Sequence, residues 1–264
     1  MERDLGEGGE DPGREPVRDF GDEPPVLLRD APPDILAPID ADAPVSGHHV
    51  APPGPSISLA DTPEHDWDHA RDLIRPAFRP VGTHGLALDS IDPEVLAKEA
   101  DKRGSQPVID EGPAGLPVVY TFAAGSFDIV VNADHLLSWG VAPSALQDAA
   151  LANLAAWSAT AAWSDEESGQ RRLISSDTGE GLDAVRILLP EVQDHLVREL
   201  GPRGRILIGL PDRHLMTAAS LAADDSEFAQ LFADFVVEQS GGADEPIDRR
   251  VFELVGGHLV EFAG

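Results

Sequence analysis

Two histidines four residues apart are the first side chains in the sequence that could ligate a metal ion. His65 and His69 follow a predicted helix start at Thr62 and Pro63. Residues at positions i and i+4 share one helix face, and two imidazoles on one face can bind Zn²⁺ or another divalent ion. The usual zinc-protease pattern has Glu directly after the first histidine, whereas Asp66 stands here, so the remaining ligands must come from elsewhere. A solvated helix face is the alternative interpretation.

A second set of polar side chains follows a predicted central strand over residues 205–210. Asp212, Arg213 and His214 come directly after it, and Ser175 and Ser176 lie at the end of another predicted strand. Loops at strand ends often carry functional side chains, and a serine, a histidine and an aspartate are the members of a hydrolytic triad. No Gly-x-Ser-x-Gly turn marks a nucleophile. A turn stabilised by Asp212 and Arg213 is the alternative.

The segment Asp177-Thr178-Gly179-Glu180-Gly181 holds a lone Gly-x-Gly. No third glycine and no Gly-Lys-Ser/Thr follows, so the sequence predicts no phosphate-binding loop and no cofactor. Asp-Thr-Gly also occurs at the paired carboxylates of aspartic proteases, but only one copy is present. The segment is therefore predicted to be a surface turn.

Trp163 is the aromatic side chain that could anchor a partner protein. It stands beside the acidic run Ser164-Asp165-Glu166-Glu167 and is expected to be exposed, whereas Trp157 and Tyr120 fall on predicted apolar faces. Exposed aromatic residues are enriched among the side chains that dominate protein–protein binding. With Asp212, Arg213 and His214, Trp163 completes the set of candidate partner-binding residues.

The charge balance limits the class of partner. The 264 residues include 48 Asp and Glu against 19 Lys and Arg, a formal net charge of −29. Such a surface repels nucleic acids and anionic membranes, so a protein partner is expected instead. The chain has no cysteine, which excludes disulfides, thiolate metal sites and cysteine nucleophiles. No signal peptide and no membrane-spanning apolar stretch is recognisable, and a cytoplasmic location is expected.

The chain divides into three predicted regions. Residues 1–60 carry 13 acidic and 4 basic residues with recurrent prolines, and such a segment buries too little apolar surface to offset its ordering entropy. It is predicted to be a disordered tail. Residues 61–112 hold two helix starts, at Thr62-Pro63 and Asp92-Pro93, and are predicted to be a helical segment that packs on the domain C-terminal to it. The first helix is expected to reach Ile74.

Residues 113–264 are predicted to form a mixed α/β domain of α+β type. Hairpins are expected at 118–131 and 251–262, a short strand at 172–175, a central strand at 205–210, and helices from Pro143, around Val192 and from Asp224. In the last helix, the apolar side chains recur at helical spacing and form a core-facing stripe: Phe228, Leu231, Phe232, Phe235 and Val236. Because several connections are hairpins, the sheet is expected to be mixed and packed by amphipathic helices.

Four segments of this domain resemble the YtpQ-like bacterial proteins of unknown function. They are Leu116–Tyr120 with the hairpin after it, Gly140–Leu146 followed by the Ala-Leu-x-Asn-Leu pattern at 150–154, the strand–turn–strand at 204–216, and the helix at Asp224. The resemblance covers residues 113–264 and implies the fold of that domain. Residues 1–112 do not resemble the N-terminal part of the family. The resemblance implies no catalytic residues.

The sequence therefore favours a non-enzymatic protein-binding or adaptor module, with no catalytic or cofactor-binding residues assigned. A hydrolase or metal-dependent enzyme is the alternative, built from dispersed residues such as Asp212, His214 and the pair His65 and His69. A deep pocket that gathers a histidine with two carboxylates would favour the enzyme. A shallow surface with an exposed apolar patch would favour the binding module.

Overall fold

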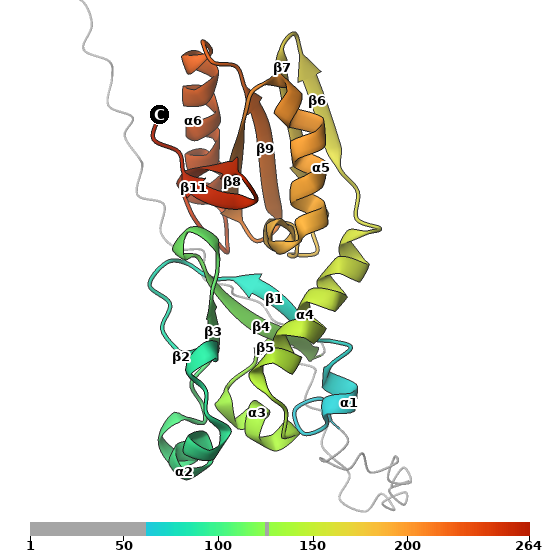
Figure 1. The fold of residues 1–264 in the computed structure, drawn as a ribbon, viewed down its shortest axis with the longest axis vertical. Helices are drawn as coiled ribbons and strands as arrows, with labels where there is room; N and C mark the ends of the chain where they lie inside the picture. Colours follow the sequence, from blue (N-terminus) through green and yellow to red (C-terminus); the bar gives the residue numbers. More distant parts are fainter. Residues whose placement is uncertain (1–61, 125–126) are drawn as a thin grey trace, which may run out of the picture. The chain divides into compact units, whose positions relative to one another are not determined.

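The computed structural model describes residues 62–124 and 127–264 (Figure 1). The tail at residues 1–60, for which the sequence predicts disorder, lies outside the described residues. The described residues form helices and two β-sheets, one mixed and one antiparallel. The predicted α+β fold class is confirmed, although the sequence predicted one sheet.

The first sheet is built around a long central strand and has the order β1-β4-β3-β2, with β5 also paired to β4. All pairs are antiparallel except β2 with β3. Helices α3 and α4 follow it directly in the chain. The elements are α1 (Trp67–Ala70), β1 (Arg75–Phe78), β2 (Leu86–Ala87), α2 (Pro93–Arg103), β3 (Val108–Glu111), β4 (Pro117–Ala124), β5 (Phe127–Val130), α3 (Ala133–Trp139) and α4 (Pro143–Ser158), with short 3-10 turns at Leu88–Ser90 and Pro113–Gly115.

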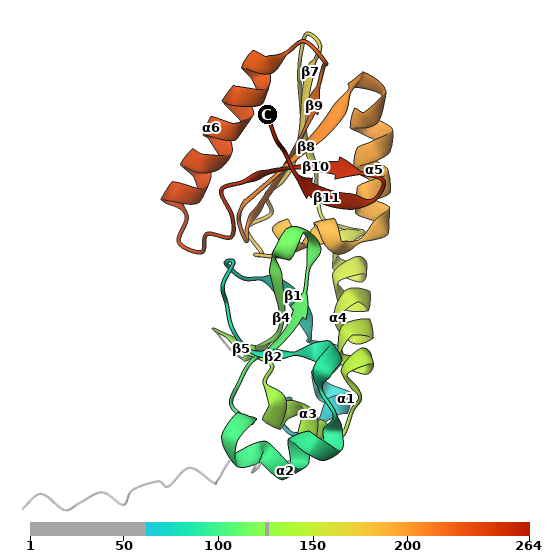
Figure 2. The same ribbon diagram turned by 60° about the vertical axis from the view of Figure 1, so that its left-hand side comes forward.

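The second sheet is antiparallel throughout, in the order β11-β10-β8-β9-β7-β6. Its helices α5 and α6 lie on opposite sides of the strands (Figure 2). The elements are β6 (Ser164–Ser168), β7 (Arg171–Ser176), the 3-10 turn η4 (Ala184–Leu188), α5 (Pro190–Leu200), the 3-10 turn η5 (Gly201–Arg203), β8 (Arg205–Asp212), β9 (Leu215–Leu221), α6 (Ser226–Gly242), β10 (Val251–Val255) and β11 (His258–Glu261).

Strand β8 is buried on both faces, as the apolar run 205–210 predicted. Ile206 and Ile208 belong to the larger core cluster, which also contains the buried face of α5. Leu207, between them, belongs to a smaller cluster with Phe232 and Val236 of α6. Because side chains alternate along a strand, one strand supplies both layers of packing.

The first predicted helix is much shorter than expected. The sequence predicted a helix over residues 62–74, but the chain forms a turn and then the single helical turn α1. Asp66 has extended backbone angles and its Oδ1 accepts a hydrogen bond from Asp68 N at 2.9 Å. Asp66 is thus the cap of α1, and it interrupts the helix between His65 and His69. The second predicted helix is confirmed as α2, with Asp92 Oδ1 accepting from Glu94 N at 2.8 Å.

Residues 61–112 also contribute strands that the sequence did not predict. Strands β1 and β3 both pair with β4, so the residues on either side of position 112 share one sheet. Pro76 made a strand at 75–78 hard to recognise, since proline lacks a ladder N–H. β1 tolerates it because β1 is an edge strand.

Helix α6 packs on the sheet through fewer of its apolar residues than the sequence predicted. Phe232 and Val236 are buried, Phe228 and Phe235 are half-buried, and Leu231 is 52% exposed. The contact is close at Gly209 of β8, where an added Cβ would lie 2.5 Å from Val236 Cγ2. The sheet therefore covers only part of the apolar face of α6, and Leu231 at its edge stays exposed.

Replacing Gly209 with alanine is expected to destabilise the protein by about 1–3 kcal/mol, because the new methyl group overpacks the contact with Val236. Urea denaturation measures the loss. Gly241→Ala is the control, because a Cβ there meets open space and alanine favours the helix. Equal stabilities of the two variants would contradict this account of the α6 contact.

His135 is expected to make stability fall as the solution is acidified. Its Nδ1 accepts a hydrogen bond from Asn132 N at 3.1 Å, which requires a neutral ring, and burial, the largest cause, lowers its pKa below the usual 6.5. His135 therefore binds a proton more readily in the unfolded chain than in the folded chain. The stability that it contributes is fully present above the unfolded pKa of 6.5 and is lost as the pH falls through the lower folded pKa.

Urea denaturation between pH 7.5 and 5.5 measures this slope. His135→Gln keeps an acceptor without a titrating ring and should reduce the slope, and the remainder includes His195, whose pKa burial also lowers. His258→Gln, at an exposed position, should leave the slope unchanged. A slope as steep in His135→Gln as in His258→Gln would contradict the assignment.

Candidate functional site

The predicted residues Asp212, Arg213 and His214 lie at the turn between β8 and β9. Asp212 Oδ1 accepts a hydrogen bond from His214 N at 2.8 Å. The guanidinium of Arg213 lies 3.1 Å from Asp128 and 2.9 Å from Glu245. Two of the three side chains are therefore engaged in holding the turn and joining it to neighbouring segments.

The structure does not join Ser175 or Ser176 to His214. Ser175 Oγ donates to Thr217 Oγ1 at 3.3 Å, and Ser176 Oγ donates to Asp183 Oδ1 at 2.5 Å. His214 Nδ1 is buried and has no hydrogen-bond partner. The sequence shows only that these residues lie at strand ends, which does not determine whether they meet. In the folded chain, neither serine is hydrogen-bonded to His214.

Ser176 belongs instead to a buried polar network around Arg186, which sequence reasoning missed. The Arg186 guanidinium is 1% exposed and donates to Ser176 Oγ at 2.6 Å, Ser158 Oγ at 3.0 Å and Ser158 O at 3.1 Å. Burial lowers the pKa of Arg186 to about 10, and the charge of nearby Asp183 opposes that shift. The sequence did contain a clue, since Arg186 stands within the apolar run Ala184–Leu189. A charged residue in a buried segment must have hydrogen-bonding or charged partners, and such a network could have been predicted there.

Trp163 lies over this arginine and is half-buried, although the sequence predicted it to be exposed. The Arg186 guanidinium is 3.9 Å from the centre of the Trp163 ring and 5.6 Å from that of Trp157. His195 packs on Trp163 with ring centres 4.9 Å apart. Trp163 thus supplies a cation–π contact inside the protein, which compensates part of the desolvation of Arg186.

The segment 177–181 forms a loop held by the same network. Asp183 accepts from Thr178 Oγ1 at 2.9 Å, and Glu180 accepts from Trp157 Nε1 at 2.8 Å. Gly181 has φ +74°, and an added Cβ would collide with the guanidinium of Arg213. The second glycine of the lone Gly-x-Gly is therefore required by the left-handed backbone of this loop at position 181.

A hollow of about 380 Å³ lies beside His214 and is also lined by three carboxylates, those of Asp177, Asp212 and Glu238. A histidine with carboxylates is the arrangement that general acid–base chemistry uses. The lining also includes Leu215, Gln239, Gly242 and Ala243, so it offers no serine, threonine or lysine nucleophile.

His65 and His69 are not presented together on one helix. His65 lies in the turn before Asp66, with Nδ1 3.4 Å from Ser138 Oγ, and His69 Nδ1 lies 3.4 Å from Asp66 Oδ2. Within residues 62–124 and 127–264, no three His, Asp or Glu side chains are grouped so that they could hold a metal ion.

An apolar groove runs between α6 and strands β6 and β7, with a volume of about 380 Å³. We call it the α6 groove. Leu231 is 52% exposed at its wall, and Phe232 closes its base. Two arginines line it, but each is paired: Arg171 with Asp225 at 2.7 Å and Arg172 with Asp165 at 2.6 Å. The complete lining is Glu166, Glu167, Ser168, Arg171, Arg172, Leu173, Phe228, Leu231, Phe232 and Phe235.

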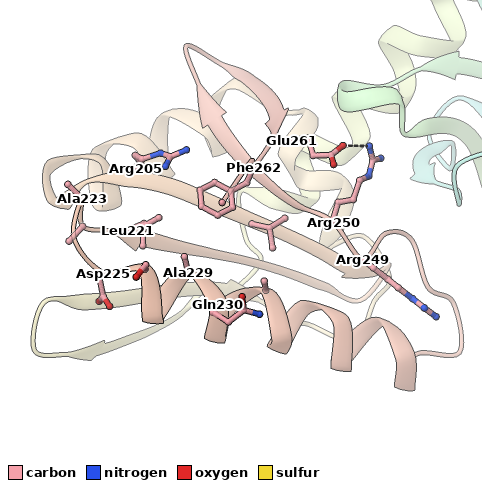
Figure 3. Close-up of a pocket in the computed structure, with 15 residues that line it drawn as sticks. Arg205, Leu221, Ala223, Asp225, Ala229, Gln230, Arg249, Arg250, Glu261 and Phe262 are labelled. Carbon is pink, nitrogen blue, oxygen red and sulfur yellow. Dashed lines mark hydrogen bonds and ion pairs between the residues drawn. The ribbon is translucent and has the colours of Figure 1, made fainter.

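A second and larger hollow, of about 810 Å³, lies on the other flank of α6 (Figure 3). Small side chains of α6, Ala229 and Ala233, leave the space, and Phe262 lies opposite them. Two of its three arginines are also paired, Arg205 with Glu253 at 2.6 Å and Arg250 with Glu261 at 3.2 Å, and the third is the exposed Arg249. Helix α6 is therefore flanked by open space on both sides.

No family model, curated protein or solved structure matches this chain. In the part of the chain that the structure describes, no helix is both long and apolar enough to cross a bilayer.

Replacing Arg186 with methionine is expected to cost about 3–5 kcal/mol of stability, because it leaves the carboxylate of Asp183 buried without its cationic neighbour. Thermal and urea denaturation measure the loss. The exposed Arg249 provides the control, since Arg249→Gln removes the same charge and should change stability by less than about 0.5 kcal/mol. A loss in Arg186→Met no larger than in the control would show that the network does not stabilise the fold.

Proposed function

We propose that this protein is a non-enzymatic binding module that holds an amphipathic helix of a partner protein in the α6 groove. The observation that carries the proposal is the exposure of Leu231, at 52%, beside the half-buried rings of Phe228 and Phe235. Large apolar side chains gathered in one groove are typical of surfaces that bind other proteins.

The width of the second sheet supports a helical occupant. Six strands at about 4.8 Å spacing form a sheet about 24 Å wide, and a helix with its side chains is about 10–12 Å across. On this face the sheet carries α6, whose buried contacts involve Phe232 and Val236 over β8 and β9. Room for a second helix therefore lies beside α6.

Charge supports a partner that is basic around its apolar face. The strand at the rim of the groove, β6, is exposed along its whole length and carries Asp165, Glu166 and Glu167. The arginines of the groove are already neutralised by carboxylates, and the chain has a net charge of −29. A helix with leucines on one face and lysines or arginines along its borders matches both features.

Residues 113–264 resemble the YtpQ-like proteins, and we propose membership of that family for this part of the chain. The absence of cysteine accords with a cytoplasmic location, which we also propose. Neither proposal assigns a catalytic residue.

Leu231→Asp is expected to weaken binding of a Leu/Lys amphipathic helical peptide at least tenfold, because burying a leucine contributes about 1.5–3 kcal/mol. Fluorescence anisotropy with the full chain measures the affinity. Val237→Asp is the matched control, since Val237 lies on the same helix, is 49% exposed and does not line the groove.

A Leu/Glu peptide of the same length tests the charge argument and should bind far more weakly. Equal affinities of the Leu231→Asp and Val237→Asp variants would refute the groove as the binding surface. A native partner captured from the host should likewise be lost with Leu231→Asp and kept with Val237→Asp.

A further inference from the structure

A hollow of about 250 Å³ lies on the first sheet, remote in sequence from α6. The side chains of Val119 and Val130 line it, and they alternate with Tyr120 and Val131, which point into the core. The hollow is therefore on the face of the sheet opposite the core. Its complete lining is Arg79, Thr83, Ser105, Pro107, Val119, Val130 and Asn132.

This lining contains no carboxylate, although the chain has 48 acidic residues. It contains one arginine, Arg79, which is half-buried. The Arg79 side chain makes no ion pair with the described residues, whereas Arg205, Arg213 and Arg250 are all paired with carboxylates. A guanidinium that no carboxylate of residues 62–124 and 127–264 neutralises is available to an anionic ligand.

The backbone holds Arg79 in place without using its side chain. Arg79 N donates to Pro117 O at 2.9 Å, which extends the pairing of β1 with β4. The five N–H donors of the guanidinium therefore remain for a ligand, and a carboxylate or phosphate can accept two of them in parallel.

Further hydrogen-bonding groups border the arginine. Asn132 Oδ1 accepts from His135 N at 3.0 Å, so the amide NH₂ of Asn132 remains a donor. Thr83 Oγ1 donates to Pro80 O at 2.8 Å and keeps its lone pairs as acceptors, and Ser105 contributes an exposed hydroxyl. The polar groups thus combine donors for an anion with acceptors for a neighbouring hydroxyl.

The remaining lining residues are apolar: Pro107, Val119 and Val130. Pro107 and Val130 are half-buried and present the apolar surface, whereas Val119 is 1% exposed and lies beneath them. The volume is slightly below the ~300–1,000 Å³ of sites for drug-sized ligands, which limits the ligand to a small molecule.

We propose that this hollow binds a small organic anion, with its carboxylate or phosphate on Arg79 and its apolar body against Pro107 and Val130. This site is independent of the α6 groove. Both anion types share the chemistry that the guanidinium recognises, and the experiment separates them.

Isothermal titration of the full chain with phenyl phosphate, benzoate, inorganic phosphate and phenol tests the proposal. We expect phenyl phosphate or benzoate to bind more tightly than inorganic phosphate, and phenol not to bind. The preferred anion identifies the class of ligand. Chemical shifts of the Val130 methyl groups should move with the bound ring.

Arg79→Gln should weaken the preferred ligand at least tenfold, and Arg79→Lys should weaken it less, because lysine keeps the charge but loses the paired donors. Arg249→Gln, which removes an exposed arginine elsewhere, should change the affinity less than twofold. The melting temperature of Arg79→Gln checks that the variant is folded. Absence of binding by both aromatic anions, or equal weakening by Arg79→Gln and Arg249→Gln, would overturn the proposal.

Discussion

The burial of one arginine is the constraint on which the second half of the molecule depends. Arg186 is fully enclosed and donates to side chains or carbonyls from the end of α4 and from β7, while Asp183 holds the loop that comes after β7. A buried guanidinium is tolerated only when its donors are satisfied, so these segments must meet in one arrangement. The loop and the β8–β9 turn are positioned as a result.

The two proposed sites have a common geometric cause, which is that the cover over each sheet is incomplete. In the second sheet, α6 contributes Phe232 and Val236 to the packing and leaves Leu231 exposed. In the first sheet, Val119 and Tyr120 of β4 are each 1% exposed, and the hollow lies where Arg79, Pro107 and Val130 are only half-buried. The open space beside these buried strands is then available for a ligand.

Periodicity predicted most of the elements, because a helix or strand with one buried face leaves a regular pattern in the sequence. Helices α4, α5 and α6 were recognised in this way, whereas the hairpins and β8 were recognised from β-rich or apolar runs and α2 from its start at Asp92-Pro93. It did not predict β1, which contains Pro76, or β6, whose residues are all exposed and polar. Nor could it predict the long-range partners of Arg186, since partnership depends on contacts between distant segments. His65 and His69 were placed on one helix because the local cap formed by Asp66 was not recognised.

The acidic strand β6 also has a consequence for association between copies of the chain. β6 is the outer strand of the second sheet, so the N–H and C=O groups on its free side could pair with a strand of another molecule. Asp165, Glu166 and Glu167 place the same acidic side chains on this edge of every copy, so repulsion between two such edges opposes the pairing of identical chains. The acidic rim that suits a basic partner therefore also works against self-association through this strand.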